Sequence, residues 1–563
     1  MNEATAGIGP GADIRLTVPP PAVVLYPSKG RQEPHGPQEP PRLGRVLARA
    51  AAVTAALTVA GSLLGLVRDQ TIAHLFGAGS DSDAFLVAWT VPEMASTLLI
   101  EDAMALVLVP AFSHALARRA AGASPDPVRG LVSATLPRLF VLLSCAAGAL
   151  ILGAQVVVEL LAPGLASPEL AVSCTRLTAI TVLTFGISGY LSAALRAHRS
   201  YLPPAAIYLA YNVGIIVTMV VLHSLWGVRA AAAGVAAGSM LMVLVQLPAF
   251  MRHMRVKRRR RKSRPHGGGG PVGTARPALL GLGVLAPVVL FAVCRQSQVL
   301  IERFLASSLP AGAISHLNYA QKVAQMPMVL SLMICTVTFP VVAQAVADGD
   351  EDRARRRVEQ DLVLAAVVVL VGTALVVGYA PQLIEVLFQR GAFGAEDVAT
   401  TASVMRVYAL GLLGHCLVGA LVRPFFSASR PIWYPAAVMA AGLLITTVVG
   451  AFAVQPWGVY GIAAANAVGI TMTAVLLLSG LGSRVVSIRV RGVTAALGRL
   501  TVAATAAGAI GWLLAPLVPG PLLSLGLGCL LVPGVFAVSV LVLRGPNVAE
   551  LLDLTNQRFR HAR

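Results

Sequence analysis

Long apolar stretches alternate with short polar segments along almost the whole chain. Most stretches are about 20 residues or longer, the length that an α-helix needs to cross the hydrocarbon core of a bilayer. The pattern predicts about fourteen membrane-spanning helices, at residues 46–67, 84–112, 134–160, 172–195, 204–224, 230–251, 278–301, 314–344, 362–380, 398–422, 432–453, 458–480, 495–517 and 521–543. The expected fold class is therefore an all-α polytopic membrane protein.

Basic residues test this assignment, because they collect in the cytoplasmic loops of membrane proteins. When alternate loops are taken as cytoplasmic, 36 of the 44 lysines and arginines fall on one side. Only Arg68, Arg229, Arg303 and Arg390 fall on the other side, and the remaining four lie within spans. The bias predicts that both termini are cytoplasmic. It also explains the net charge of +19 without a nucleic-acid partner.

Two halves of the chain repeat one another. Residues 69–79 (DQTIAHLFGAG) align without a gap with residues 302–312 (ERFLASSLPAG), and residues 109–117 (VPAFSHALA) align with residues 339–347 (FPVVAQAVA). Six spans separate the copies, so both copies face the same way across the membrane. The repeat predicts two six-helix lobes related as parallel repeats, with two extra C-terminal helices, and a substrate site between the lobes.

Changes in composition predict the remaining boundaries. The expected order is a disordered cytoplasmic tail (1–42), an N-lobe (43–252), a basic Gly-rich cytoplasmic linker (253–276), a C-lobe (277–482), spans 13 and 14 (483–545) and a cytoplasmic tail (546–563). The six cysteines lie in apolar segments without paired spacing, so neither a disulfide framework nor a metal site is expected.

Charged residues inside the predicted spans are candidates for function, because a charge at the centre of a membrane helix costs about 2.5–3.5 kcal/mol. Such groups have to pair or to line a wet cavity, and one plausible pairing sets Glu101 or Asp102 against Lys322 or Arg295. An excess of cations would suit an anionic substrate such as a pyrophosphate-linked lipid. The candidates for contact with that substrate are Arg68, Lys322 and Arg295. The candidates for gating or charge pairing are Asp69, Asp83, Glu101, Asp102 and Glu302.

Two groups of charges also have a simpler interpretation. Those near the predicted outer interface could extend their charged ends to the headgroups, namely Arg68, Asp69, Glu302 and Arg303. Arg176 and Arg406 occupy equivalent positions in the repeat and are expected to hold backbone carbonyls or a carboxylate.

The chain lacks the sequence motifs of common enzymes. It has no GxxxxGK[ST] phosphate loop, no HExxH and no GxSxG, so no ATP site and no catalytic role are expected. No cofactor is expected either. Transport would instead draw on a coupling ion or on the membrane potential.

Several short motifs, taken in order, resemble the MurJ/MviN family of lipid II flippases over residues 46–482. They are GLVRD at 65–69, FGAG at 76–79, DAFLVA at 83–88, ERFLASS at 302–308, LNYA at 317–320 and LFQRGAF at 387–393. The resemblance implies the two-lobed fold of the multidrug/oligosaccharidyl-lipid/polysaccharide transporter superfamily. It further implies that a polyprenyl-pyrophosphate-linked cell-wall precursor is moved from the inner to the outer leaflet by alternating access.

Matching positions carry over some of the family's charged residues. Arg68, Asp69 and Asp83 match, and Lys322 stands where the family usually has arginine. The positions of three other family arginines are occupied by Ser62, Ser96 and Thr97. Those losses leave open a divergent paralogue that exports another lipid-linked glycan or an amphipathic metabolite.

A further alternative is a non-transporting membrane scaffold whose linker and tails recruit cell-wall synthesis proteins. The expected location in every case is the bacterial plasma (inner) membrane. The expected partners are a lipid-linked anionic substrate, membrane lipids and cell-wall synthesis proteins.

Overall fold

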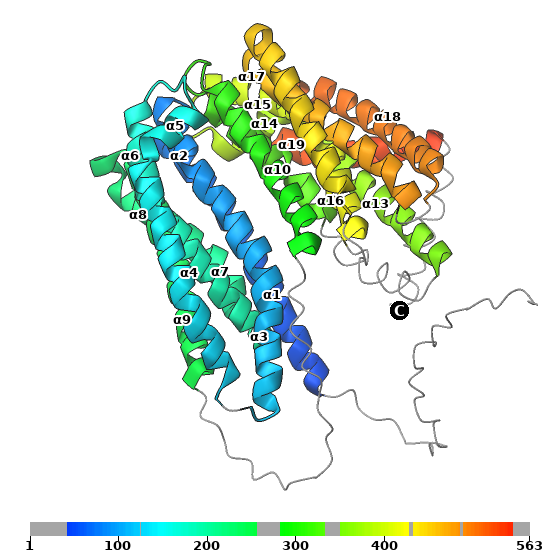
Figure 1. Cartoon of the computed structure of the whole chain (residues 1–563). Coiled ribbons are helices and arrows are strands. Elements are labelled where there is room, and N and C mark those ends of the chain that lie inside the picture. Colours follow the sequence, from blue (N-terminus) through cyan, green and yellow to red (C-terminus); the bar gives the residue numbers. More distant parts are fainter. Residues whose placement is uncertain are drawn as a thin grey trace, which may run out of the picture. The chain divides into compact units, whose positions relative to one another are not determined.

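The computed structural model describes residues 42–123, 125–255, 282–332, 350–426, 432–484 and 488–543 (Figure 1). All regular secondary structure in these ranges is helical, which confirms the all-α class. The chain divides into Met1–Ala51 and Ala52–Arg563. All contacts described below lie within the second unit.

Nine α-helices and one π-helical segment form the first half of the chain. They are α1 (Arg42–Phe76), α2 (Ser80–Ser96), a π-helix (Thr97–Ala103), α3 (Met104–Ala120), α4 (Pro127–Leu152), α5 (Ala154–Leu161), α6 (Pro168–Thr178), α7 (Ile180–Ala197), α8 (Leu202–Trp226) and α9 (Arg229–Arg255). The π-helix joins α2 to α3, so residues 80–120 form one continuous helical run. π-helical turns inside α-helices are frequent at functional sites.

The second half repeats this order of long and broken helices. It contains α10 (Leu282–Ala306), α11 (Ala313–Ala324), α13 (Glu351–Gly378), α14 (Ala380–Phe388), α15 (Ala395–Ala409), α16 (Leu412–Phe426) and α17 (Tyr434–Arg484). The short helices α5 and α14 each follow a long helix, and both α6–α7 and α15–α16 are interrupted. The α15–α16 pair is bent by 46°. Two further helices, α18 (Val490–Leu514) and α19 (Pro521–Val542), follow the repeat.

In the described ranges every predicted span coincides with a helix; residues 278–281 of the seventh span and 333–344 of the eighth lie outside these ranges. Spans 11 and 12 both lie in α17, which is interrupted at Gly458, where φ is +52°. In the described part of the chain, nine helical segments are long and apolar enough to cross a membrane, or ten if the bent pair forms one span.

Small residues let α8 and α9 pack closely. A Cβ atom on Gly214 would lie only 2.6 Å from the Cα atom of Gly238 on the facing helix. Helices in lipid associate largely through such close packing, since lipid tails are as apolar as the side chains that they would replace. The two helices lie side by side along much of their length (Figure 1).

Candidate functional site

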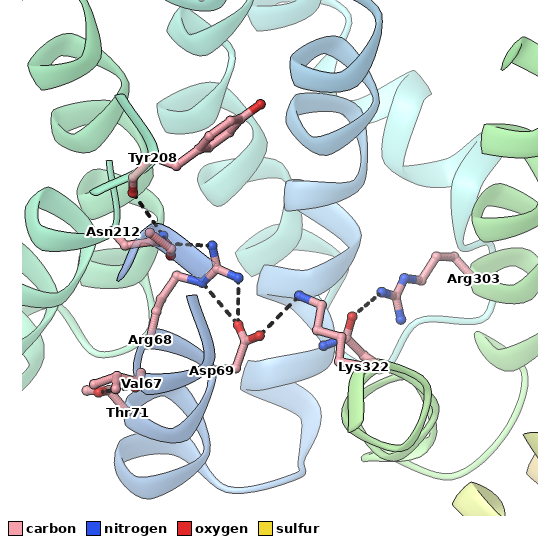
Figure 2. Close-up of polar contacts among 10 residues, drawn as sticks. Val67, Arg68, Asp69, Thr71, Tyr208, Asn212, Arg303 and Lys322 are labelled. Carbon is pink, nitrogen blue, oxygen red and sulfur yellow. Dashed lines mark hydrogen bonds and ion pairs between the residues drawn. The ribbon is translucent and has the colours of Figure 1, made fainter. Parts of the chain in front are cut away.

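Asp69 on α1 lies between two cations that come from different halves of the chain. Its Oδ1 atom accepts hydrogen bonds from Nε and Nη2 of Arg68, at 3.0 and 2.8 Å. Its Oδ2 atom lies 3.5 Å from Nζ of Lys322 on α11. Figure 2 shows the carboxylate between the two basic side chains. The sequence thus identified three residues that meet in space, and Lys322 pairs with Asp69. The predicted pairing of Lys322 with Glu101 or Asp102 stays a prediction, because the side chains of those two residues lie outside the described part of the chain.

Asn212 on α8 fixes the direction of the Arg68 side chain. Its Oδ1 atom accepts a hydrogen bond from Nη1 of Arg68 at 2.9 Å. Its Nδ2 atom donates to the carbonyl oxygen of Gly61 at 3.0 Å. The same atom donates to the carbonyl oxygen of Tyr208, also at 3.0 Å (Figure 2). The bonds to Arg68 and Gly61 join α8 to α1, and the bond to Tyr208 stays within α8, so the amide group is fixed in place and the guanidinium is oriented before any ligand arrives.

Trp89 on α2 contacts both cations. The guanidinium carbon of Arg68 lies 4.3 Å from a ring centroid of the indole, and Nζ of Lys322 lies 4.7 Å from it. The indole is 4% exposed. An aromatic face attracts a cation by about 0.5–2 kcal/mol, and more strongly where water is excluded. Trp89 therefore offsets part of the repulsion between two like charges that share one carboxylate.

The three charged groups carry a net positive charge of one, since Arg68 and Lys322 face a single carboxylate. The Lys322 side chain keeps 25% of its surface exposed, whereas that of Asp69 keeps only 7%. An incoming anion can therefore approach the ammonium group without first displacing Asp69. Diphosphate oxygens are suitable acceptors for a guanidinium and an ammonium held side by side.

Asp83 on α2 makes a second contact between the halves, at the start of α11. Its Oδ2 atom accepts a hydrogen bond from the backbone N–H of Gly312 at 2.7 Å. Its Oδ1 atom accepts from the N–H of Ser315 at 2.7 Å and from Oγ of Ser315 at 2.6 Å. The carboxylate thus caps a helix of the other half, where the unpaired N–H groups and the helix dipole favour a negative charge.

Two further contacts join the halves near the same turns. The N–H of Ala392 donates to the carbonyl of His74 at 2.9 Å, and the N–H of Gly164 donates to Oγ of Ser307 at 3.3 Å. Gly312 has φ = +94°, and a Cβ atom there would lie 2.6 Å from the carbonyl oxygen of Ala78. We refer to these contacts and the Asp83 hydrogen bonds together as the turn contact.

Glu302 and Arg303 on α10 are buried, with 4% and 5% exposure. Glu302 accepts hydrogen bonds from the hydroxyl of Tyr408 and from the side-chain amide of Asn466. Arg303 donates to the carbonyl of Ile314 at 3.1 Å and to Oδ1 of Asn318 at 3.0 Å. Neither side chain extends to the interface, because each finds its partners inside the second half.

Asp69 is also buried, so its carboxylate does not extend to the lipid headgroups. Arg68 is likewise paired, as described above. Of the two equivalent arginines, Arg406 donates from Nε to the carbonyl of Val377 at 3.0 Å, which is the structural role expected for it.

The remaining predicted residues lie elsewhere. Arg295 is on α10, seven residues before Glu302. Glu101 and Asp102 lie on the π-helix, and their side chains are outside the described residues. Their roles stay predictions.

Sequence reasoning missed the neutral partners Trp89, Asn212 and Ser315. One signal was present for Asn212, because it is a lone amide in an otherwise apolar helix. For Trp89 and Ser315 no local signal exists, since their importance depends on which helix faces them.

Comparison with known proteins supplies independent information. The family described as "Lipid II flippase MurJ" matches residues 72–525. A lipid II flippase MurJ from Burkholderia cenocepacia is 28% identical over 448 residues, covering 78% of this chain and 84% of the relative. A probable lipid II flippase MurJ from Synechocystis sp. is 28% identical over 488 residues, covering 83% and 87%.

Solved structures agree on the fold. A lipid II flippase MurJ in an inward closed conformation superposes with a TM-score of 0.68 at 16% identity, covering 87% of this chain and 98% of that structure. An inward-facing multidrug resistance MATE family transporter of the MOP superfamily gives a TM-score of 0.59 at 14% identity, covering 79% and 99%.

Proposed function

The chain belongs to the lipid II flippase MurJ family, and on this premise we propose that it moves lipid II, a polyprenyl-pyrophosphate-linked peptidoglycan precursor, from the inner to the outer leaflet. Flipping is transport without bond chemistry, so the protein is not an enzyme. The protein is a multi-pass membrane protein of the bacterial inner membrane, and it works among membrane lipids.

The observation that carries the proposal is the pair of cations held around Asp69. Arg68 and Lys322 come from different halves, and both are oriented by Trp89 and Asp69. A diphosphate that binds both cations would compete with Asp69 for the hydrogen bonds that Arg68 and Lys322 donate. Substrate binding would thereby change a contact between the halves, which is what alternating access requires.

We assign gating to Asp83. The turn contact closes one end of the interface between the halves, and that end is the outer one if the bias of basic residues gives the orientation. Release of substrate there requires the Asp83 hydrogen bonds to break. Residues 43–252 and 277–482 would move as the two lobes.

The other predicted residues would support transport without holding the diphosphate between Arg68 and Lys322. Glu302 would pair with the neighbouring charge of Arg303 within the C-lobe, and Tyr408 and Asn466, which donate hydrogen bonds to it, belong to the same lobe. Arg295 would contact the substrate deeper along α10. Glu101 and Asp102 would lie along the N-lobe side of the path. Both termini would be cytoplasmic.

The direct biological test is rescue of bacteria depleted of their own lipid II flippase. We expect the wild-type chain to restore growth and cell shape. Failure to rescue, with selective binding of a different polyprenyl lipid in native mass spectrometry, would favour a paralogue with another substrate. If a chain without residues 1–42 and 257–273 still rescues fully, a scaffold role for the tail and linker is excluded.

Substitutions of Trp89 should weaken lipid II binding to different degrees, according to how much of the aromatic face they remove. Trp89→Leu removes two cation–π contacts worth about 0.5–2 kcal/mol each, so lipid II affinity should fall about fivefold or more. Trp89→Phe keeps an aromatic face and should lose less than about threefold. Fluorinated tryptophans incorporated at this position should weaken binding stepwise with each added fluorine, which packing alone would not produce.

Trp457 on α17 provides the matched control, since its side chain is 63% exposed. Trp457→Leu should leave lipid II affinity unchanged. Equal losses for Trp89→Leu and Trp89→Phe would show that the indole acts only by its size.

A further inference from the structure

A cavity of about 810 Å³ lies within the first half, away from Asp69. It is bordered by α5, α6, the end of α8 and the start of α9. Four of its lining residues are charged, and all four are exposed: Glu159, Glu169, Arg176 and Arg229. The cavity lies at the same end of the helices as the α1–α2 turn.

Its charges remain available to a ligand. In the described parts of the chain, none of the ion pairs joins an arginine of this cavity to one of its glutamates. Glu159 accepts one hydrogen bond, from Gln155 at 3.0 Å. Opposite charges that line one cavity without pairing fit a ligand that itself carries both signs.

The rim of the cavity is apolar on one side. Leu225 and Trp226 at the end of α8 are 77% and 51% exposed. Tryptophan at the end of a membrane helix is typical of the interface between headgroups and acyl chains. A ligand in the cavity would therefore place its polar part among the charges and its apolar part along α8.

The second half shows what the equivalent position looks like when it is covered. Arg406, which corresponds to Arg176 in the repeat, lines a smaller cavity of about 340 Å³ together with Trp512 and Leu513 of α18. Its Nε atom is already bonded to the carbonyl of Val377. The additional helices thus cover this arginine, whereas Arg176 remains open.

We propose that the first-half cavity binds the headgroup of a zwitterionic aminophospholipid, phosphatidylethanolamine, from the leaflet on the side of the α1–α2 turn. The phosphate lies against Arg176 and Arg229, because guanidinium groups match phosphate geometry. The ammonium lies against Glu159 and Glu169, which repel lipids with a purely anionic headgroup. This site is separate from the lipid II path and does not depend on the proposed transport activity.

Native mass spectrometry of the full chain, titrated with phosphatidylethanolamine, phosphatidylglycerol and phosphatidylcholine, tests the site. We expect one tightly bound phosphatidylethanolamine in the wild type. Arg176→Ala combined with Arg229→Ala should weaken it at least about tenfold, because charge-assisted bonds to the phosphate are lost. Glu159→Gln combined with Glu169→Gln should reverse the preference toward phosphatidylglycerol.

Arg390→Ala is the matched control, since Arg390 is exposed at the same end of the helices but outside this cavity, and it should change nothing. All four lining residues are exposed, so their variants should fold. The proposal is overturned if the wild type binds phosphatidylglycerol as tightly as phosphatidylethanolamine, or if the arginine variant retains wild-type affinity.

Discussion

Replacing Arg68 and Lys322 by glutamine in one chain should abolish rescue of flippase-depleted cells and weaken lipid II binding by about 100-fold or more. Each charge-assisted contact to a phosphate is worth about 1.5–3 kcal/mol, and two are removed. Binding should be measured with purified lipid II in native mass spectrometry, and rescue should be measured as growth.

A charge-balanced variant separates binding from folding. The double substitution leaves Asp69 buried without a cation, and breaking a buried pair in this way costs about 3–5 kcal/mol. Adding Asp69→Asn removes that penalty, so the triple variant should reach wild-type membrane levels while still failing to bind. Arg390→Gln, at an exposed site, should keep full activity. A triple variant that still rescues would show that these cations do not hold the substrate.

Asp83→Asn should open the turn contact. Asparagine keeps one acceptor oxygen but lacks the negative charge. Its NH2 group is a donor, and it would face the backbone N–H groups of Gly312 and Ser315, which are donors too. A loss of roughly 2–3 kcal/mol would shift the balance between closed and open forms by about 30- to 150-fold. To measure this, spin labels are attached to cysteines introduced at Ser80 and Glu396 in a chain without its native cysteines. Double electron–electron resonance should report a longer distance between the two labels in Asp83→Asn than in the unsubstituted chain.

The neighbouring carboxylate Asp81 is the control, because it is exposed at the start of α2 and accepts its hydrogen bond from Ser80 of the same helix. Asp81→Asn should leave the distance distribution unchanged. An unchanged distribution for Asp83→Asn would show that the other turn contacts hold this end closed without Asp83.

The apolar pattern predicted the helices well, and its errors are informative. The first span was predicted to end at residue 67, yet α1 continues to Phe76. The two charges after residue 67 end the apolar stretch, but Arg68 and Asp69 pair inside the protein and lie within the helix. The π-helix between α2 and α3 leaves no mark in the hydrophobic pattern, because it changes the hydrogen-bond register and not the composition.

The candidate site was predictable only in its charged part. An ion inside a membrane helix is costly enough to stand out, which is why Arg68, Asp69, Asp83 and Lys322 could be found from the sequence. The groups that orient them are neutral, and Trp89 or Ser315 would look the same on a helix facing lipid. Which partner each charge takes depends on contacts between helices more than 140 residues apart, such as Arg68 with Asn212.

The central claim is tested most directly by following lipid II across the membrane. In rescued cells, lipid II exposed to an externally added enzyme that cleaves its headgroup should be as abundant with this chain as with a native flippase. With the Arg68→Gln/Asp69→Asn/Lys322→Gln variant it should remain inaccessible and accumulate in the inner leaflet. Equal exposure with the wild type and this variant, in cells without any other flippase, would contradict the account.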